Sequence, residues 1–407
     1  MRSKKKDVNE WDAVLQSNMW DFASQNILPT LRLSYYHLPS HSKQCFAYCA
    51  IFPKGYAYKK EIVLLWMAEG LLVPSRGNTD PLEMDESCFH DLVARSFFQP
   101  SETSESGFIM HDLIHDLAKF VSGEFCLRLE GDDLCKIPKT VRYLSYASVE
   151  HDISRKIMGI SEAQHLRTFA IINSPAWWWI EAMDDENIFG LLSKFKYLRV
   201  LNLYYCIHRV ELSDVVGNWK HLRLNLSGAA IKRLPEIVST LYNLQIVILY
   251  RCRRLIELPT HIARLINLCH LDIRDTGLLE MPSQMGRLTK LQSLSDFFIG
   301  ERNGSSLNEL GKLQYLQGEL SIHNLQNVVD VEDASESNLK GKRHLRKLEL
   351  LWNGNPDDSQ RERSVFEQLQ PHTKVECLFI KGYCGTKFPD SLGDSSFNFS
   401  KIEALWV

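Results

Sequence analysis

The feature that most constrains this chain is a pattern of apolar residues, mostly leucines, that returns every 23 or 24 positions in the middle of the sequence. The pattern has the form LxxLxL, and its clearest copies are Leu198-Leu201-Leu203, Leu244-Val247-Leu249 and Leu268-Leu271-Ile273. A proline then follows each of three successive copies at a fixed place, at Pro235, Pro259 and Pro282. Similarity at one fixed period indicates a repeat protein rather than an ordinary globular domain.

The length of the repeat predicts its structure. Periods of about 20–29 residues with this leucine pattern are typical of leucine-rich repeats, in which each unit is one short strand and a return segment. A single unit cannot bury its leucines, so neighbouring units stack and share one continuous core. Weaker copies begin near Val141 and Leu166, and more degenerate ones near Leu345 and Val375. We therefore predict a leucine-rich-repeat domain over residues 138–407, incomplete at its carboxyl end.

The positions between the leucines predict a recognition surface. Side chains alternate along a strand, so the x positions of LxxLxL face outward on the concave side. These residues form a mixed aromatic, polar and charged set that suits protein binding, although many are expected to be only solvated strand positions. The predicted protein-binding residues are Asn202, Tyr204, Asn225, Ser227, Ile248, Tyr250, Asp272 and Arg274.

One repeat is a residue short. The segment Leu222-Arg223-Leu224-Asn225-Leu226 lacks one position of the pattern, and a slip of one residue turns every side chain to the other face. Two explanations remain open at this point. Either the strand has a local kink, or Leu222 is not the first inward residue.

The segment before the repeats has a helical pattern. Apolar residues recur at spacings of three and four, the mark of a helix with one buried face. A polar tip at Ser101–Gly107 separates two short apolar runs, which predicts a hairpin, and a last helix begins near His111. A hairpin before the last of three or four helices is a winged-helix-like arrangement. The predicted fold is therefore α/β, with a winged-helix-like, mostly helical domain at 28–131 followed by the solenoid.

Composition excludes several classes of protein. The net charge of −3 gives no reason to expect a polyanion partner. No run of about 18 apolar residues occurs, so no membrane span is expected. The ten cysteines include no CxxC pair, which favours reduced, buried thiols in a cytoplasmic protein.

Four ordered motifs in the first part carry a resemblance to a known family. They are Leu31-Arg32-Leu33-Ser34-Tyr35 with Leu38-Pro39, Cys45-Phe46-Ala47-Tyr48-Cys49-Ala50-Ile51-Phe52-Pro53, Leu65-Trp66-Met67-Ala68-Glu69-Gly70 and Met110-His111-Asp112. In this order, and with repeats behind them, the motifs resemble those of plant nucleotide-binding leucine-rich-repeat disease resistance proteins of the coiled-coil class. The resemblance covers nearly the whole chain. It implies that 1–27 is the end of the first helical part of a nucleotide-binding module and that 28–131 is its winged-helix part.

The resemblance also implies roles for Met110, His111 and Asp112. In the family the histidine of this motif contacts the phosphates of bound ADP and helps to hold the resting state. A helix start offers free N–H groups, and an imidazole can donate to an anion, so the chemistry is reasonable. The simpler interpretation is an ordinary polar helix start with Asp112 in the first turn, and it is preferred for this chain by itself.

The nucleotide site itself is incomplete in this sequence. No GxxxxGK[ST] phosphate loop occurs, because Gly311-Lys312 and Gly341-Lys342 lack the upstream glycine and the hydroxyl residue. We therefore expect no cofactor for this chain alone, and ADP or ATP in the full-length family. The sequence has the features of a truncated receptor. Its repeats would bind a pathogen effector, a guarded host protein or other receptor domains, coupled to an ADP/ATP switch supplied elsewhere.

A stand-alone adaptor that binds proteins through its repeats, or a non-functional truncated receptor, remains the alternative. A DNA-binding winged helix would need basic residues facing outward on its third helix, but Glu61, Trp66 and Glu69 lie there. No nucleic acid is therefore expected as a partner.

Catalysis and metal binding find little support. The missing phosphate loop argues against an ATPase, and no nucleophile motif such as GxSxG occurs, so no catalytic residue is predicted. His111 and His115 stand four residues apart, but a zinc site of the HExxH kind needs a glutamate base and a third ligand, and neither is evident.

Overall fold

The computed structural model describes residues 29–54, 59–72, 81–101, 108–130, 137–147, 159–172, 192–203, 214–219, 222–301, 304–352, 359–385, 389 and 401–405. The chain forms two compact units, one made of residues 1–176 with 197–200 and the other of 177–196 with 201–407. The predicted segment 1–27 lies outside the described residues.

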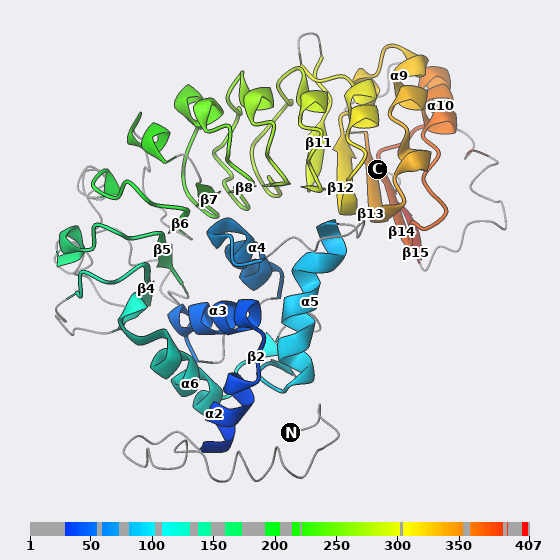
Figure 1. Cartoon of the computed structure of the whole chain (residues 1–407). Coiled ribbons are helices and arrows are strands. Elements are labelled where there is room, and N and C mark those ends of the chain that lie inside the picture. Colours follow the sequence, from blue (N-terminus) through cyan, green and yellow to red (C-terminus); the bar gives the residue numbers. More distant parts are fainter. Residues whose placement is uncertain are drawn as a thin grey trace. The chain divides into compact units, whose positions relative to one another are not determined.

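The first unit begins with the helices of a winged helix (Figure 1). They are α2 (Pro29–Tyr36), α3 (Ser40–Tyr48), α4 (Lys59–Glu69), α5 (Pro81–Ala94) and α6 (Asp112–Ser122). The strands β1 (Gln99–Pro100) and β2 (Phe108–Ile109) pair in antiparallel fashion just before α6, as the predicted hairpin requires. Helix α5 was not among the predicted elements, although its buried Cys88, Phe89 and Leu92 follow helical spacing.

The same unit continues into the first strands of the repeats. Strands β3 (Cys126–Glu130), β4 (Tyr143–Ala147) and β5 (Thr168–Ile171) pair in parallel. Ala170, Ile172 and Val200 belong to the same hydrophobic core as the helices. The predicted domain boundary at 131–138 therefore falls inside this compact unit, because the winged helix and the first strands share apolar contacts.

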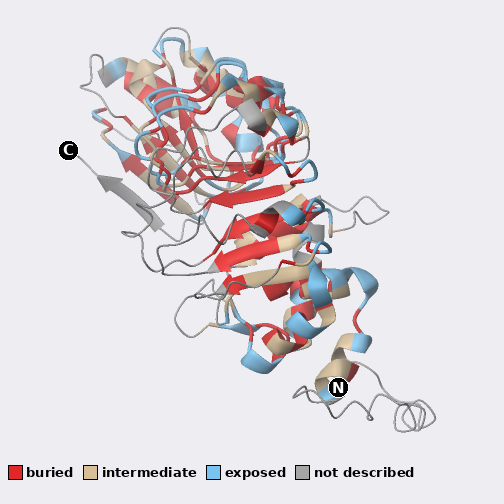
Figure 2. Cartoon of the chain, turned by 90° about the vertical axis from the view of Figure 1, so that its left-hand side faces the viewer, coloured by how far each residue is buried: buried red, intermediate tan, exposed pale blue. Residues whose placement is uncertain are grey.

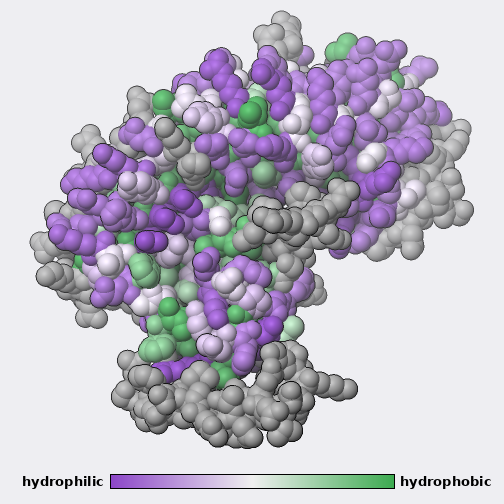
Figure 3. Space-filling view, viewed as in Figure 1, coloured by the Kyte–Doolittle hydropathy of each residue, from purple (hydrophilic) through white to green (hydrophobic). Residues whose placement is uncertain are grey.

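The second unit is a stack of repeats (Figure 1). Its strands include β7 (Arg223–Asn225), β8 (Ile246–Ile248), β9 (His270–Asp272) and β10 (Ser293–Leu294), and β6 (Val200–Leu203) spans the boundary between the units. Return segments hold short 3-10 helices such as η7 (Glu236–Thr240), η8 (Ile262–Arg264) and η9 (Met285–Arg287). Leu224, Val247, Leu271 and Leu294 are register partners in successive strands, and all four are buried. The repeat strands are mostly coloured as buried in Figure 2, and the outer return segments are mostly hydrophilic in Figure 3.

The pairing of β7 with β8 bears on the irregular repeat at Leu222–Leu226. Leu224 pairs with Val247, and Asn225 pairs with Ile248, without a shift. At this offset Leu222 would correspond to Gln245 and not to Leu244, but Leu222 stands before the first paired residue, Arg223, so the register does not decide between the two explanations. Leu222 itself is buried.

A second parallel sheet follows after Ser295. Its strands are β11 (Asp296–Phe298), β12 (Gln317–His323), β13 (His344–Leu351), β14 (Cys377–Lys381) and β15 (Lys401–Leu405). The return segments here contain η10 (Leu307–Lys312), η12 (Leu339–Gly341), α9 (Val331–Glu336) and α10 (Ser359–Gln368). The inner residues Phe297, Ile322, Leu350 and Ile380 pair across this sheet and are buried.

Candidate functional site

The Met110-His111-Asp112 motif stands at the start of α6. His111 is the N-cap residue, with an extended backbone, and its Nδ1 atom accepts a hydrogen bond of 3.2 Å from the N–H of Leu113. A neutral imidazole that accepts at Nδ1 carries its proton on Nε2. The His111 side chain is exposed, so it can present this Nε2–H to a bound anion.

The other two residues of the motif differ in exposure. Met110 is buried in the core of the winged helix. Asp112 is exposed, and the Nζ atom of Lys54 lies 3.9 Å from its carboxylate and 3.5 Å from that of Asp116. The motif thus combines one anchoring side chain with two polar side chains that face solvent.

His115 has a different role from His111. Its Nε2 atom lies 2.8 Å from the carbonyl oxygen of Phe52, which also accepts from the guanidinium of Arg128 at 2.8 Å. Burial lowers the pKa of His115, which favours the neutral ring. The two histidines therefore face different surroundings, and no group of metal-binding side chains comes together in the described part of the chain.

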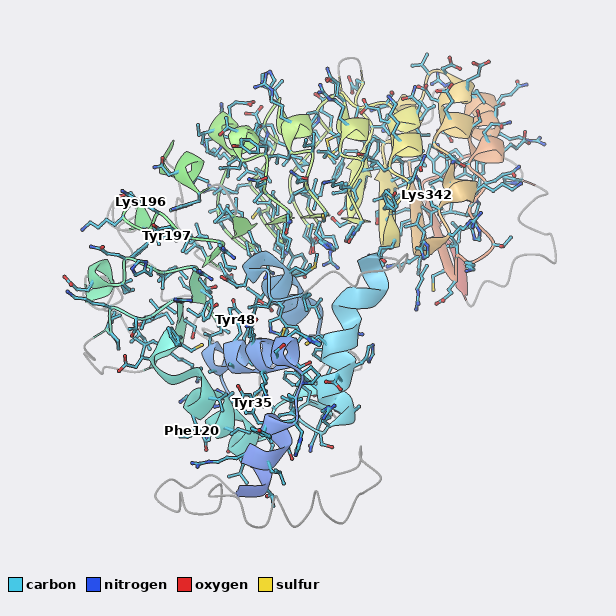
Figure 4. The ribbon with its side chains drawn as sticks, in the orientation of Figure 1. Tyr35, Tyr48, Phe120, Lys196, Tyr197 and Lys342 are labelled. Atoms are coloured by element: carbon cyan, nitrogen blue, oxygen red, sulfur yellow. The ribbon has the colours of Figure 1, made fainter. Side chains whose placement is uncertain are left out.

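The segment Cys45–Pro53 joins the winged helix to the first strands. The hydroxyl of Ser145 on β4 donates to the carbonyl of Ile51 at 2.5 Å, and the hydroxyls of Tyr48 and Thr168 lie 3.1 Å apart. Figure 4 labels Tyr48 on α3. This segment therefore connects the winged helix to β4 and β5 through a backbone carbonyl and the Tyr48 hydroxyl.

The concave positions are not all solvent-facing. Asn202, Asn225 and Ser227 are buried, and the side-chain oxygen of Asn225 accepts from the hydroxyl of Ser227 at 2.6 Å. The expectation that these three side chains are exposed is wrong in this structure, because the strand alternation does not reveal what covers a face. Tyr204 lies outside the described residues. Whether any of these residues binds a protein stays a prediction.

The remaining concave residues form an ordered cluster. Asp272 makes a bidentate ion pair with Arg274, with N–O distances of 3.0 Å and 2.6 Å. This contact raises the pKa of the Arg274 guanidinium, although burial acts in the opposite direction. The guanidiniums of Arg274 and Arg251 both lie over the ring of Tyr250, at 5.3 Å and 5.0 Å from its centroid. Ile248 is half-buried beside them. We name Ile248, Tyr250, Arg251, Asp272 and Arg274 the tyrosine cluster.

Two family models match parts of the chain. A disease resistance protein winged-helix domain matches residues 51–118, and R13L1/DRL21 leucine-rich repeats match residues 307–406. Two curated relatives match nearly the whole of this chain. An RPP13-like protein 1 of Arabidopsis thaliana, named for disease resistance, is 42% identical over 96% of this chain, and disease resistance protein RGA2 of Solanum bulbocastanum is 35% identical over 96%.

Both parts of the chain, the winged helix and the repeats, are thus similar to plant disease resistance proteins. The chain spans 38% of the length of each of these two relatives. The match to the winged-helix model includes α4, α5, the hairpin and most of α6, and so contains the Met110-His111-Asp112 motif. Among the described helices of the chain, none combines the length and apolar character that a membrane crossing requires.

The predictions above do not include the burial of two polar residues, Glu69 and Lys342. Glu69, which the DNA-binding alternative places on an outward helix face, is only 2% exposed, and so is Lys342. That placement of Glu69 is wrong, because its carboxyl group is buried and accepts a hydrogen bond from Thr168 on β5. The burial of Lys342 could have been predicted from the sequence, since it occupies a repeat position that holds leucine in four earlier repeats.

Proposed function

We propose that this chain is the recognition and relay part of an intracellular plant immune receptor. The repeats bind a protein, either a pathogen effector, a guarded host protein or another receptor domain. The winged helix passes that event to an ADP/ATP switch. The proposed role is non-enzymatic and cytoplasmic, and ADP and ATP are the proposed cofactors of the longer receptor.

The observation that carries the proposal is the geometry of His111. Its Nδ1 atom is occupied by the N–H of Leu113, so its proton is presented outward from a helix start. A donor at this place suits a phosphate oxygen. His111 and Asp112 would then support the ADP-bound resting state, because a contact made in only one state shifts the equilibrium toward that state.

The switch role is tested by Asp112→Val in a full-length receptor with this winged helix. We expect signalling without a pathogen, since contacts specific to the resting state are lost. The readout is a cell-death assay in leaves at matched protein levels. Asp116→Asn is the control, because Asp116 shares Lys54 with Asp112 but lies one turn further along α6.

A silent Asp112→Val receptor that is expressed normally and still activated by its ligand would remove the switch role from this motif. If the chain is instead a stand-alone adaptor, Asp112→Val should leave protein binding by the repeats unchanged.

The recognition role is tested at the tyrosine cluster. Tyrosine and arginine are enriched among residues that dominate binding energy, and here they are held in place before any partner arrives. We expect Tyr250→Ala or Arg274→Ala to weaken binding of a captured protein by about tenfold or more, the effect of a loss of roughly 1.4 kcal/mol. Biolayer interferometry measures the affinity. Tyr242→Ala, 56% exposed in a return segment, is the matched control, and equal affinities for all three variants would place the binding surface elsewhere.

A further inference from the structure

A buried carboxyl group lies where the winged helix meets the first strands of the repeats. Glu69 is the last residue of α4, and the next residue, Gly70, has a left-handed φ of +69° that turns the chain away. The Glu69 side chain is 2% exposed. Its Oε1 atom accepts a hydrogen bond of 2.5 Å from the hydroxyl of Thr168 on β5, which is 99 residues further along the chain.

The hydroxyl of Thr168 has a second neighbour. The Tyr48 hydroxyl lies 3.1 Å from it. The Thr168 hydroxyl has one proton. When that proton points at Glu69, the Tyr48 hydroxyl must be the donor in its contact with Thr168. One line of hydrogen bonds therefore connects α3, β5 and the end of α4.

The second carboxyl oxygen has no such partner. Oε2 of Glu69 is buried without a hydrogen bond in the described part of the chain. A carboxylate would bury a charged oxygen that no donor reaches, whereas a carboxylic acid is neutral and costs less free energy to bury. The nearest guanidinium does not satisfy it, because Arg199 donates to the backbone carbonyl of Glu69 at 2.9 Å and not to the carboxyl group.

We propose that Glu69 is a proton-operated latch between the winged helix and the first repeats. In its acid form the buried carboxyl group holds the end of α4 against β5. Loss of the proton places an incompletely solvated negative charge in the contact and favours its opening. This device is separate from the nucleotide role of His111.

The electrostatics of the surroundings agree with this assignment. Burial raises the pKa of Glu69 to about 7, and the Thr168 hydrogen bond with the charges of Arg199 and Arg167 opposes only part of that effect. The other titratable groups near it are Tyr143 on β4 and Cys126 on β3. Burial, with a smaller contribution from Glu69, raises the pKa of both, to about 12 for Cys126. Among these groups, Glu69 is the one that changes charge near neutral pH.

The sign and size of the effect follow from linkage. The closed contact binds the proton of Glu69 with a pKa of about 7, and the open contact binds it with the ordinary value of 4.5. Opening therefore releases a proton and becomes more favourable as pH rises from 4.5 through 7, and the effect levels off above the pKa of the closed contact. Between pH 6 and pH 8 the opening equilibrium is expected to grow about tenfold.

Hydrogen exchange of the 407-residue chain tests the latch. The measured quantity is the protection of the amides of Thr168–Ile171 and of Gly70 and Leu71, corrected for the intrinsic effect of pH. Wild-type protection should fall about tenfold from pH 6 to pH 8. Glu69→Gln should lose this pH dependence, because the amide does not titrate.

The matched control is Glu124→Gln. Glu124 also accepts a hydrogen bond from a threonine hydroxyl, that of Thr140 at 2.9 Å, but this pair is exposed. The control should retain the wild-type tenfold fall. Wild-type protection that is equal at both pH values, or a fall that persists in Glu69→Gln, would overturn the proposal.

A second variant and a spectroscopic measurement keep the test decisive if Glu69→Gln does not fold. Thr168→Val removes the donor that favours the charged carboxylate, so the midpoint of the protection change should move to higher pH. Infrared difference spectra of the wild-type chain between pH 6 and pH 8 should show a protonated carboxylic acid band that disappears with the same midpoint as the protection. A midpoint that is unchanged in Thr168→Val, or the absence of that band, would contradict the latch.

Discussion

Replacing Trp66 with alanine is expected to destabilise the winged helix by about 3–5 kcal/mol, the usual cost of removing a buried aromatic side chain. Trp66 is fully buried in the middle of α4, and its ring centroid lies 6.2 Å from that of Phe89 on α5. Truncation removes the apolar contacts between the two helices and leaves a cavity that a close-packed core fills only in part.

The measurement must report on this unit alone, because two compact units need not unfold in one step. The slowest-exchanging amides of α3 and α4 provide such a signal. Tyr36→Ala is the control, since Tyr36 is 61% exposed on α2 and its loss should change stability by no more than about 0.5 kcal/mol. Equal protection in the two variants would show that Trp66 does not anchor the core.

The burial of the main apolar residues could be predicted from the sequence. Leu201, Leu249 and Leu271 were expected inside the solenoid, and all three are fully buried. The fixed period was enough for the repeats, because stacking forces equivalent leucines into one core. The hairpin and the helix start at His111 were equally readable, since both depend on local turn and capping chemistry.

Features that depend on distant parts of the chain could not be predicted in this way. The alternation of side chains along a strand predicts the face on which Asn225 lies. It does not predict whether other parts of the chain bury that face. The change to a second sheet after Ser295 has no clear mark in the repeat pattern. Glu69 looked like a surface residue because its partner, Thr168, is 99 positions away.

The candidate nucleotide-sensing site illustrates the same division. The motif placed His111 at a helix start, and its resemblance suggested a phosphate contact. Only the geometry shows that Nδ1 is already occupied by the N–H of Leu113, which fixes the proton on Nε2 in the neutral ring.

Because of Lys342, we expect the free energy of unfolding of the second unit to rise in alkaline solution. Lys342 follows η12 where Leu241, Leu265, Leu288 and Leu313 follow the corresponding helices of earlier repeats. Its ammonium donates to the carbonyls of Leu310 and Leu313, at 2.7 Å and 2.9 Å. Figure 4 labels Lys342 within the repeats.

Burial lowers the pKa of Lys342 from 10.5 to about 8, because the charged ammonium loses its water. The folded state therefore releases this proton before the unfolded state does. Between pH 8 and pH 10.5 the unfolded chain binds more protons at this site, so the free energy of unfolding should rise with pH. The full gain is about 3 kcal/mol, because lowering the pKa from 10.5 to about 8 changes the free energy of unfolding by about 1.36 kcal/mol for each factor of ten in proton affinity.

Comparison with Lys342→Met isolates this effect from the other groups that titrate at high pH. The stability of the wild-type second unit relative to the variant should increase by about 3 kcal/mol from pH 7.5 to pH 10.5, as measured by urea unfolding. Lys340→Met is the control, because Lys340 is exposed two residues away and should give no such difference. If wild type and Lys342→Met keep a constant difference across this range, then Lys342 keeps an ordinary pKa in the fold. Its two carbonyl contacts would in that case compensate the charge fully, and the lysine would be held at a leucine position by hydrogen bonds alone.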